Sequence, residues 1–265
     1  MAITLFLIAI LTSVVGSICG IGGGVLIKPI LDSVGIMSVS AVSFLSGCTV
    51  LAMAVISVGK SLSNRQTKIN KKITPILGVG AAVGGVIGKL VFSYIKQVAG
   101  NESLVGLVQS IVLAFITVAT LVYMYCKHQD KIHTLRIENY AASAIIGLLL
   151  GLLSSFLGIG GGPINLAVLS FFFSMDTKES ATNSLFIILL SQIASLIQTL
   201  MTASVPTFNV LFLCVMVGGG VVGGFAGQAV NKKLSERQVE RLFNVLLVVV
   251  VGVCVYNAVR FGSMS

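Results

Sequence analysis

Long apolar runs alternate with short polar segments along the whole chain. The runs lie at about residues 2–18, 25–35, 41–58, 73–95 and 103–126, and then at 139–157, 163–175, 181–200, 208–230 and 242–261. Many of them approach the roughly 20 residues that an α-helix needs to cross the hydrocarbon core of a bilayer. The pattern therefore predicts an all-α polytopic membrane protein with five helical segments in each half.

The two halves of the chain share landmarks at a nearly constant spacing. The segment Cys19-Gly-Ile-Gly-Gly-Gly24 matches Leu157-Gly-Ile-Gly-Gly-Gly162, and Ser40-Ala-Val-Ser43 matches Ser180-Ala-Thr-Asn183. Glycines at four-residue steps follow in both halves, at Gly80, Gly84 and Gly88 and at Gly219, Gly223 and Gly227. Such internal self-similarity indicates a repeated unit. We therefore predict a first repeat at 1–126, a cytoplasmic linker at 127–138 and a second repeat at 139–265.

The distribution of positive charge indicates how the repeats are oriented. Lys and Arg gather in the predicted loops 59–72, 127–138 and 231–241, and the positive-inside rule assigns such loops to the cytoplasm. The segments equivalent to two of these loops in the other half, 201–207 and 96–102, carry few charges or none. Equivalent helices therefore run in opposite directions, as in transporters built from inverted repeats, and both termini are expected outside.

Glycines at 20–24 and 158–162 interrupt the first two apolar runs of each half. Each pair of runs is too short for two full crossings with a turn and too long for one. We expect a re-entrant-like hairpin of two half-helices that turns near the middle of the bilayer, followed by three transmembrane helices. Irregular backbone at that depth is tolerated where it is buried in protein or lines a wet cavity, so the turns are expected to face a cavity.

These glycine turns form the main candidate binding site. Glycine permits positive φ angles, and the helices expected to begin at about Val25 and Pro163 add the amide donors and partial positive charge of helix N-termini. Two such turns facing each other would bind an anion between them without a buried cation. The expected donors are the backbone amides of Gly22, Gly23, Gly24, Gly160, Gly161 and Gly162. The alternative is a pair of tight hairpin bends that bind no ligand.

The chain resembles the sulfite exporter TauE/SafE family of membrane permeases over essentially its whole length. The two Gly-x-Gly-Gly-Gly turns, the Ala-x-[Ser/Asn] starts of the third segments and the glycine-stepped helices carry the resemblance. The start Ala181-Thr-Asn-Ser-Leu185 fits the family pattern, and Ala41-Val-Ser-Phe-Leu45 fits it loosely. The resemblance implies a permease of the bacterial plasma (inner) membrane that moves sulfur-containing anions such as sulfite, thiosulfate or a sulfonate.

Polar side chains near the turns complete the candidate site. Ser43, Asn183 and Ser184 lie near the start of the third segment of their repeats, and Asn165 lies one turn into the helix that follows the second glycine turn. Their hydroxyl and amide groups can bind the oxygens of an anion, or they can cap and join helices. Lys28 follows the first turn. An ionisable residue inside the membrane is a functional candidate, although a lysine can also extend to the interface.

Other polar and small residues are assigned less specific roles. Lys89, near the outer end of its predicted helix, is expected to extend to the membrane interface. Asp32 lies near the end of an apolar run, as do the other acidic residues of the hairpins, so the sequence gives no support for proton coupling through a buried carboxylate. The glycine steps are expected to pack their helix closely against its counterpart in the other half. A chemical role for Cys19 or Cys48, which lie near the first turn and in the third segment, stays open.

Composition excludes several other classes of protein. Hydrophobic residues make up 56% of the 265 residues and charged residues only 9%, whereas soluble domains carry about 25% charged residues. The net charge of +9 arises mainly from the loops, which argues against nucleic-acid binding. The five cysteines have no metal-type spacing, and both histidines lie in the linker, so no catalytic residue, metal or cofactor is expected.

The predicted function is that of a secondary transporter that exports a small inorganic or organic sulfur anion, bound at mid-membrane between the two turns. A membrane potential that is negative inside favours anion export by about 2.3 kcal/mol per charge per 100 mV. An anion channel of inverted-repeat architecture is the nearest alternative, and a membrane enzyme is the third. The sequence leaves open the particular anion, the coupling ion and the choice between monomer and homodimer.

Overall fold

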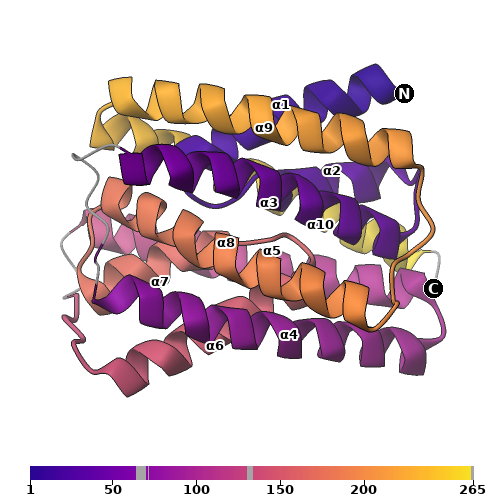
Figure 1. The fold of residues 1–265 in the computed structure, drawn as a ribbon, viewed down its shortest axis with the longest axis horizontal. Coiled ribbons are helices and arrows are strands. Elements are labelled where there is room, and N and C mark those ends of the chain that lie inside the picture. Colours follow the sequence, from indigo (N-terminus) through magenta and orange to yellow (C-terminus); the bar gives the residue numbers. More distant parts are fainter. Residues whose placement is uncertain (64–69, 71, 130–133, 264–265) are drawn as a thin grey trace.

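The computed structural model describes residues 1–63, 70, 72–129 and 134–263, and their secondary structure is helical throughout (Figure 1). In the first half the helices are α1 (Ala2–Cys19), α2 (Gly24–Val34), α3 (Val39–Ser63), α4 (Ile73–Ala99) and α5 (Glu102–His128). In the second half they are α6 (Tyr140–Leu157), α7 (Pro163–Phe173), α8 (Thr177–Met201), α9 (Val210–Lys233) and α10 (Glu236–Gly262). Each predicted apolar run corresponds to one of these helices, so the all-helical fold class is confirmed.

Short polar side chains fix where five of the helices begin. The side chain of each of these N-cap residues accepts a hydrogen bond from a backbone amide of the first turn, which would otherwise lack a partner. These residues are Asn101, Asn139, Asp176, Asn209 and Ser235. Ser235 forms a full capping box with Gln238, so α10 begins before the apolar run at 242.

The hairpin of each half has one long arm and one short arm. Helices α1 and α6 have 18 residues, whereas α2 and α7 have 11. At 1.5 Å per residue the arms are roughly 27 Å and 16 Å long, so the expectation of two half-helices holds for the second arm only. Eight helices of the described chain, α1 and α6 included, are long and apolar enough to cross a membrane.

The glycine steps bring helices from opposite halves into backbone contact. A Cβ atom on Gly84 of α4 would lie 1.9 Å from the carbonyl oxygen of Leu148 in α6, and one on Gly223 of α9 would lie 2.8 Å from that of Ile10 in α1. Only glycine permits such close approach, so the packing role is confirmed. The expected partner was wrong, because α4 packs on α6 and α9 on α1 instead of on each other.

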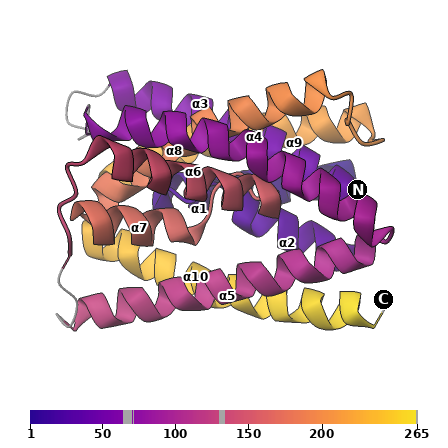
Figure 2. The same cartoon turned by 90° about the horizontal axis from the view of Figure 1, so that it is seen from below.

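Most of the remaining packing also joins the two halves. Helix α5 packs along α10, and α3 packs on α8 (Figure 2). Helix α3 contacts α9, and the equivalent helices of the other half, α8 and α4, also contact each other. In the same way α2 contacts α10, and the equivalent helices α7 and α5 contact each other. The pairing is thus preserved when the halves are exchanged. This is the arrangement that a repeat requires, and the inverted orientation of the repeats stays a prediction.

The two ends of the molecule differ in charge. Both termini lie at one end of the molecule (Figure 1). The helix ends that flank the three basic segments, including Ser63, Tyr140 and Lys233, lie at the opposite end (Figure 1). We call these the terminal end and the basic end. Residues 64–69, 71 and 130–133 of the predicted loops lie outside the described residues.

Candidate functional site

Most glycines of the two turns have the backbone conformation that the sequence predicts. Positive φ angles occur at Gly20, Gly22, Gly158, Gly160 and Gly161. Helix α7 begins at Pro163, as expected, and α2 begins at Gly24, one residue before the predicted start. Gly23, with φ −61°, and Gly162, with φ −165°, have conformations open to any L-residue.

Backbone amides of both turns are left without partners. Among the backbone hydrogen bonds of the described residues, none is donated by Gly22, Gly23, Gly160, Gly161 or Gly162. The N-cap glycines, Gly23 for α2 and Gly162 for α7, also lack a capping side chain. A buried amide without a partner costs free energy, so these donors are available to a bound anion or to water.

The two turns contact each other through their backbones. A Cβ atom on Gly24 would lie 2.0 Å from the carbonyl oxygen of Ile159, and one on Gly161 would lie 3.0 Å from that of Ile21. The turns therefore meet at the centre of the molecule, as predicted. Their own backbone atoms fill the space between them, so an anion could lie between the turns only if they separated.

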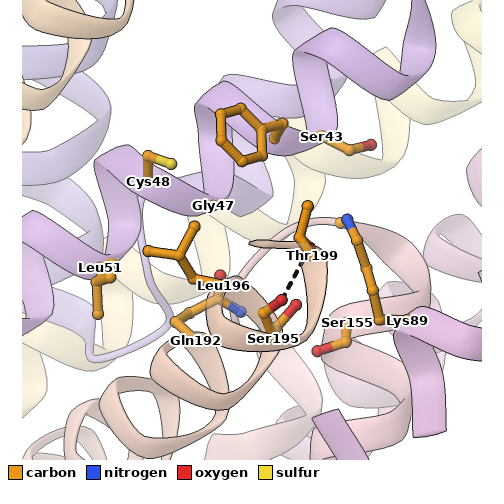
Figure 3. Close-up of a pocket in the computed structure, with 12 residues that line it drawn as sticks. Ser43, Gly47, Cys48, Leu51, Lys89, Ser155, Gln192, Ser195, Leu196 and Thr199 are labelled. Atoms are coloured by element: carbon orange, nitrogen blue, oxygen red, sulfur yellow. Dashed lines mark hydrogen bonds between the residues drawn. The ribbon is translucent and has the colours of Figure 1, made fainter. Parts of the chain in front are cut away.

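A small cavity of about 30 Å³ lies beside the second turn (Figure 3). We call it the Lys89 cavity. Helices α3, α4, α6 and α8 supply its walls, through Ser43, Phe44, Gly47, Cys48, Leu51, Lys89, Ser155, Gly158, Gln192, Ser195, Leu196 and Thr199. Most of its polar side chains are buried, and Lys89 and Cys48 are half-buried.

Ser43 and Gln192 connect this cavity to the glycine turn. A Cβ atom on Gly158 would lie 2.6 Å from the Ser43 Oγ, and one on Gly160 would lie 3.2 Å from the Gln192 Cδ. The Ser43 hydroxyl is buried and has no hydrogen-bond partner. The structure thus brings one predicted site residue, Ser43, beside the turn whose amides are free.

Lys89 supplies the positive charge of the cavity, which corrects the expectation that it extends to the membrane interface. Its side chain reaches from α4 to the part of the cavity bordered by Ser43 and Thr199 (Figure 3). The ammonium lies 5.3 Å from the centre of the Phe92 ring. Within the described ranges the ion pairs are Lys28–Asp32 and Lys96–Glu102, so no carboxylate neutralises Lys89.

The sequence contained a signal for the α8 wall that was not used. Gln192, Ser195 and Thr199 are spaced three and four residues apart, which aligns them on one face of a helix. The predicted site did not include Ser155, Gln192, Ser195 or Thr199. A polar stripe of this kind on a membrane helix indicates a buried contact or a wet cavity.

On the side of the turns toward the basic end, apolar side chains close the space between α3 and α8. Val50, Met53 and Val58 of α3 pack with Leu185 and Ile188 of α8 in one buried cluster. Val50 and Ile188 also contact the turns, since they are the nearest side chains to a Cβ placed on Gly160 and on Gly161. The Lys89 cavity therefore does not continue past the turns along this route.

Asn183 joins helices, although it was predicted to bind substrate. Its Nδ2 donates to the carbonyl oxygen of Glu179 at 2.7 Å, and its Oδ1 accepts from the Asn70 amide at 3.1 Å and from the Thr74 hydroxyl at 2.5 Å. The side chain is fully buried. These bonds fasten α8 to the start of α4 at the basic end, away from the Lys89 cavity.

Asn165 and Ser184 lie together in the core. The Asn165 Nδ2 donates to the Ser184 Oγ at 3.3 Å, and both side chains are buried. The Asn165 Oδ1 has no partner and lies at a small cavity bordered by Gly161 and Gly162. These two residues are therefore close to the second turn, on a different side from the Lys89 cavity.

Lys28 lies in a separate cavity, where it is paired with an acid. Its Nζ is 2.6 Å from the Asp32 Oδ2, and both side chains are about 95% buried. Asp32 thus lies inside the protein, which corrects the expectation that no carboxylate is buried. No group of His, Cys, Asp and Glu side chains that could hold a metal ion occurs in the described part of the chain.

The described residues contain eight helices that are long and apolar enough to cross a membrane. The two hairpins meet at glycine turns, and a buried polar cavity lies beside them. These features define a multi-pass membrane protein of the transporter class. The sulfite exporter TauE/SafE family model matches residues 5–253. The chain therefore belongs to this family, as its sequence suggested, and is a membrane transporter and not an enzyme.

Two curated relatives agree with this assignment. The chain is 22% identical to a Bacillus subtilis protein described as "Probable membrane transporter protein YunE", over 97% of this chain and 98% of that protein. It is 25% identical to a probable membrane transporter protein of Methanocaldococcus jannaschii, over 92% of this chain and 91% of that protein. No solved structure matches the fold significantly.

Proposed function

We propose that this protein is a secondary transporter that exports a small sulfur-containing anion, such as sulfite, thiosulfate or a sulfonate, across the bacterial plasma membrane. The observation that carries the proposal is the unpaired charge of Lys89 in a cavity lined by hydroxyl groups. An isolated charge is costly to remove from water unless it is paired. An anion of matching size would supply the missing partner.

The remaining groups around Lys89 suit an oxyanion. Such an anion needs several hydrogen-bond donors at once, because each of its oxygens loses water on entering the cavity. Ser43 and Ser155 have buried hydroxyls without partners, Gln192 offers an amide, and Gly160 of the second turn, whose backbone amide is free, lies next to Gln192. In this proposal the anion lies beside the second turn and is bound by side chains and backbone together.

The apolar cluster between α3 and α8 favours a transporter over a channel. A channel needs a continuous path, whereas alternating access requires that one side be closed while the other is open. Val50, Met53, Leu185 and Ile188 provide such a closure toward the basic end. A membrane potential that is negative inside would drive a charged anion outward, and export needs no ATP-binding element.

The test is transport by purified protein in liposomes, measured as concentration-dependent uptake of radiolabelled sulfite. We expect Lys89→Gln to raise the KM by roughly tenfold to a hundredfold, since a hydrogen bond to a charged group contributes about 1.5–3 kcal/mol. Lys89→Arg should retain part of the activity. Saturation and counterflow in the wild type would distinguish a transporter from a channel.

Lys60→Gln is the matched control for the loss of a lysine. Lys60 also lies over an aromatic ring, 4.3 Å from the centre of Phe225, but it lies outside the Lys89 cavity. Transport by Lys60→Gln should equal that of the wild type. Unchanged affinity for sulfite in Lys89→Gln would contradict the proposed site.

Orientation is tested separately. We propose that the basic end faces the cytoplasm and that both termini lie outside, because positively charged loops stay inside. Ser63 and Ser204 are exposed; Ser63 ends α3 and Ser204 follows the end of α8, and these two helices finish at opposite ends of the molecule (Figure 1). Cysteines at these positions should react with a membrane-impermeant thiol reagent from opposite sides in oriented vesicles, and labelling from one side would contradict the proposed topology.

A further inference from the structure

A second polar cavity surrounds the buried ion pair of Lys28 and Asp32. We call it the Lys28 chamber. It lies between α2, α5, α10 and the end of α6 and is lined by Lys28, Pro29, Asp32, Gln109, Ser110, Leu113, Leu157, Cys254 and Asn257. It shares no lining residue with the Lys89 cavity. The proposed anion site therefore gives it no role.

Three oxygen atoms in this region have no hydrogen-bond partner. They belong to side chains that are 94–99% buried, and they are the Asp32 Oδ1, the Gln109 Oε1 and the Asn257 Oδ1. Gln109 donates through Nε2 to the carbonyl oxygen of Phe156 at 2.6 Å, and Asn257 donates through Nδ2 to that of Pro29 at 2.8 Å. Because a carbonyl can only accept, these bonds fix the orientation of both amides. All three oxygens are thus acceptors.

The charges around the chamber select what can occupy it. Lys28 and Asp32 neutralise each other, and Arg260 donates to the backbone carbonyl oxygens of Asp32 and Ser33. The Cys254 thiol is the other titratable group of the lining. Unpartnered acceptor oxygens repel an anion, and the ammonium of Lys28 opposes a metal cation. The occupant that fits is a proton, delivered by water.

We propose that Asp32 is a proton-binding site that couples proton movement to the movement of the anion. A proton from water would bind the free Oδ1 of the Asp32 carboxylate, giving a neutral carboxylic acid, and would return to water on release. Protonation breaks the neutral ion pair, so Lys28 gains an uncompensated positive charge. That state is costly in a buried site and is favoured when an anion lies nearby.

The structure supplies a short connection between the chamber and the proposed anion site. Leu157 lines the Lys28 chamber, and the next residue, Gly158, lines the Lys89 cavity. Gln109 holds the carbonyl oxygen of Phe156, one residue earlier. Proton and anion are therefore expected to bind together and to cross the membrane in the same direction. This coupling rests on the proposed function.

The experiment measures protons and anions together in liposomes. Thiosulfate is the probe, because sulfite itself carries protons near neutral pH. For the wild type we expect about one proton to move with each thiosulfate, since the chamber holds a single carboxylate. A luminal pH dye and radiolabelled thiosulfate give the ratio. Thiosulfate flux without proton movement in the wild type would overturn the proposal, whatever the variants do.

The decisive variant is the double substitution Lys28→Gln with Asp32→Asn, which keeps polar side chains at both positions and removes both charges. It should still exchange external for internal thiosulfate but move no protons with it, and its flux should lose its dependence on pH. A merely structural pair would leave the proton ratio of the folded variant unchanged, and that result would overturn the coupling. Absence of both sulfite and thiosulfate flux in the wild type would instead contradict the proposed function and, with it, the coupling.

Discussion

Two lysines lie inside the protein in opposite electrostatic situations. Lys28 is paired with Asp32 at 2.6 Å in a chamber that also contains the unpartnered amide oxygens of Gln109 and Asn257. Lys89 has no acidic partner among the described residues and lies in a cavity lined by hydroxyl groups. The same side chain is therefore neutralised in one region and available to a ligand in the other.

The difference shows that the partner of a buried charge indicates its role better than its position in the sequence does. A charge that already has a partner contributes to the fold, or titrates together with that partner. A charge without a partner attracts a counter-ion. This comparison favours Lys89 over Lys28 as the residue that binds the anion, although the sequence made Lys28 the candidate.

Removal of a partner should separate the two regions most clearly. We expect Asp32→Asn to destabilise the protein by about 3–5 kcal/mol, because it leaves the Lys28 charge buried and unpaired. Lys89→Gln should change stability by less than about 1 kcal/mol, since no partner is lost. Thermal unfolding in detergent measures both, and an equal loss in the two variants would contradict the comparison.

Anion binding should stabilise the protein most when Lys89 is present. Sulfite at a hundred times the wild-type dissociation constant is expected to add about 2.7 kcal/mol to the free energy of unfolding. This gain should persist in the double variant Lys28→Gln with Asp32→Asn and fall to about 0.4–1.4 kcal/mol in Lys89→Gln, whose affinity is expected to be tenfold to a hundredfold weaker. A gain that depended on Lys28 and not on Lys89 would reverse the assignment of the two cavities.

Two cysteines allow the cavities to be probed chemically. Cys48 lines the Lys89 cavity and is half-buried, whereas Cys254 lines the Lys28 chamber and is 1% exposed. In variants that retain one cysteine each, Cys48 should react with an impermeant thiol reagent roughly tenfold faster or more, because Cys254 requires local opening. Sulfite should slow labelling of Cys48 alone. Equal rates would show that the two cavities are equally accessible.

The smallest expected effect concerns single hydroxyl groups. Ser155→Ala should raise the KM for sulfite by about fivefold, as expected for loss of a hydrogen bond that contributes about 1 kcal/mol. Ser110→Ala, in the Lys28 chamber, is the control, since its hydroxyl already donates to the carbonyl oxygen of Gly106 at 2.8 Å. The same kinetic measurement on both variants tests whether the anion contacts one cavity only.

Hydropathy was sufficient to predict the helices but not their full extent. The run predicted at 242–261 belongs to α10, which spans Glu236–Gly262. The additional residues at its start are charged, and Ser235 caps them. An apolar run marks the part of a helix that lies in lipid, whereas the hydrogen-bonded helix continues into water until a cap ends it.

The glycine turns could be predicted because their conformation depends on local sequence, whereas the Lys89 cavity could not. Positive φ angles at Gly22 and Gly160 follow from the residue type itself. The position of Lys89 depends on which helices surround α4, and α6 and α8 come from the other half of the chain. No local pattern determines that arrangement, so the lysine was expected at the interface.

The exchange of partners between halves also constrains how the protein can be made. Helix α1 leaves the ribosome well before its glycine-matched partner α9, which belongs to the second half of the chain. A nascent chain that has inserted α1 to α5 but not α6 to α10 therefore exposes surfaces shaped for helices not yet synthesised. Assembly must be late and must be completed within the bilayer. If the gene arose by duplication, its single-repeat ancestor would have needed a second copy to cover those same surfaces.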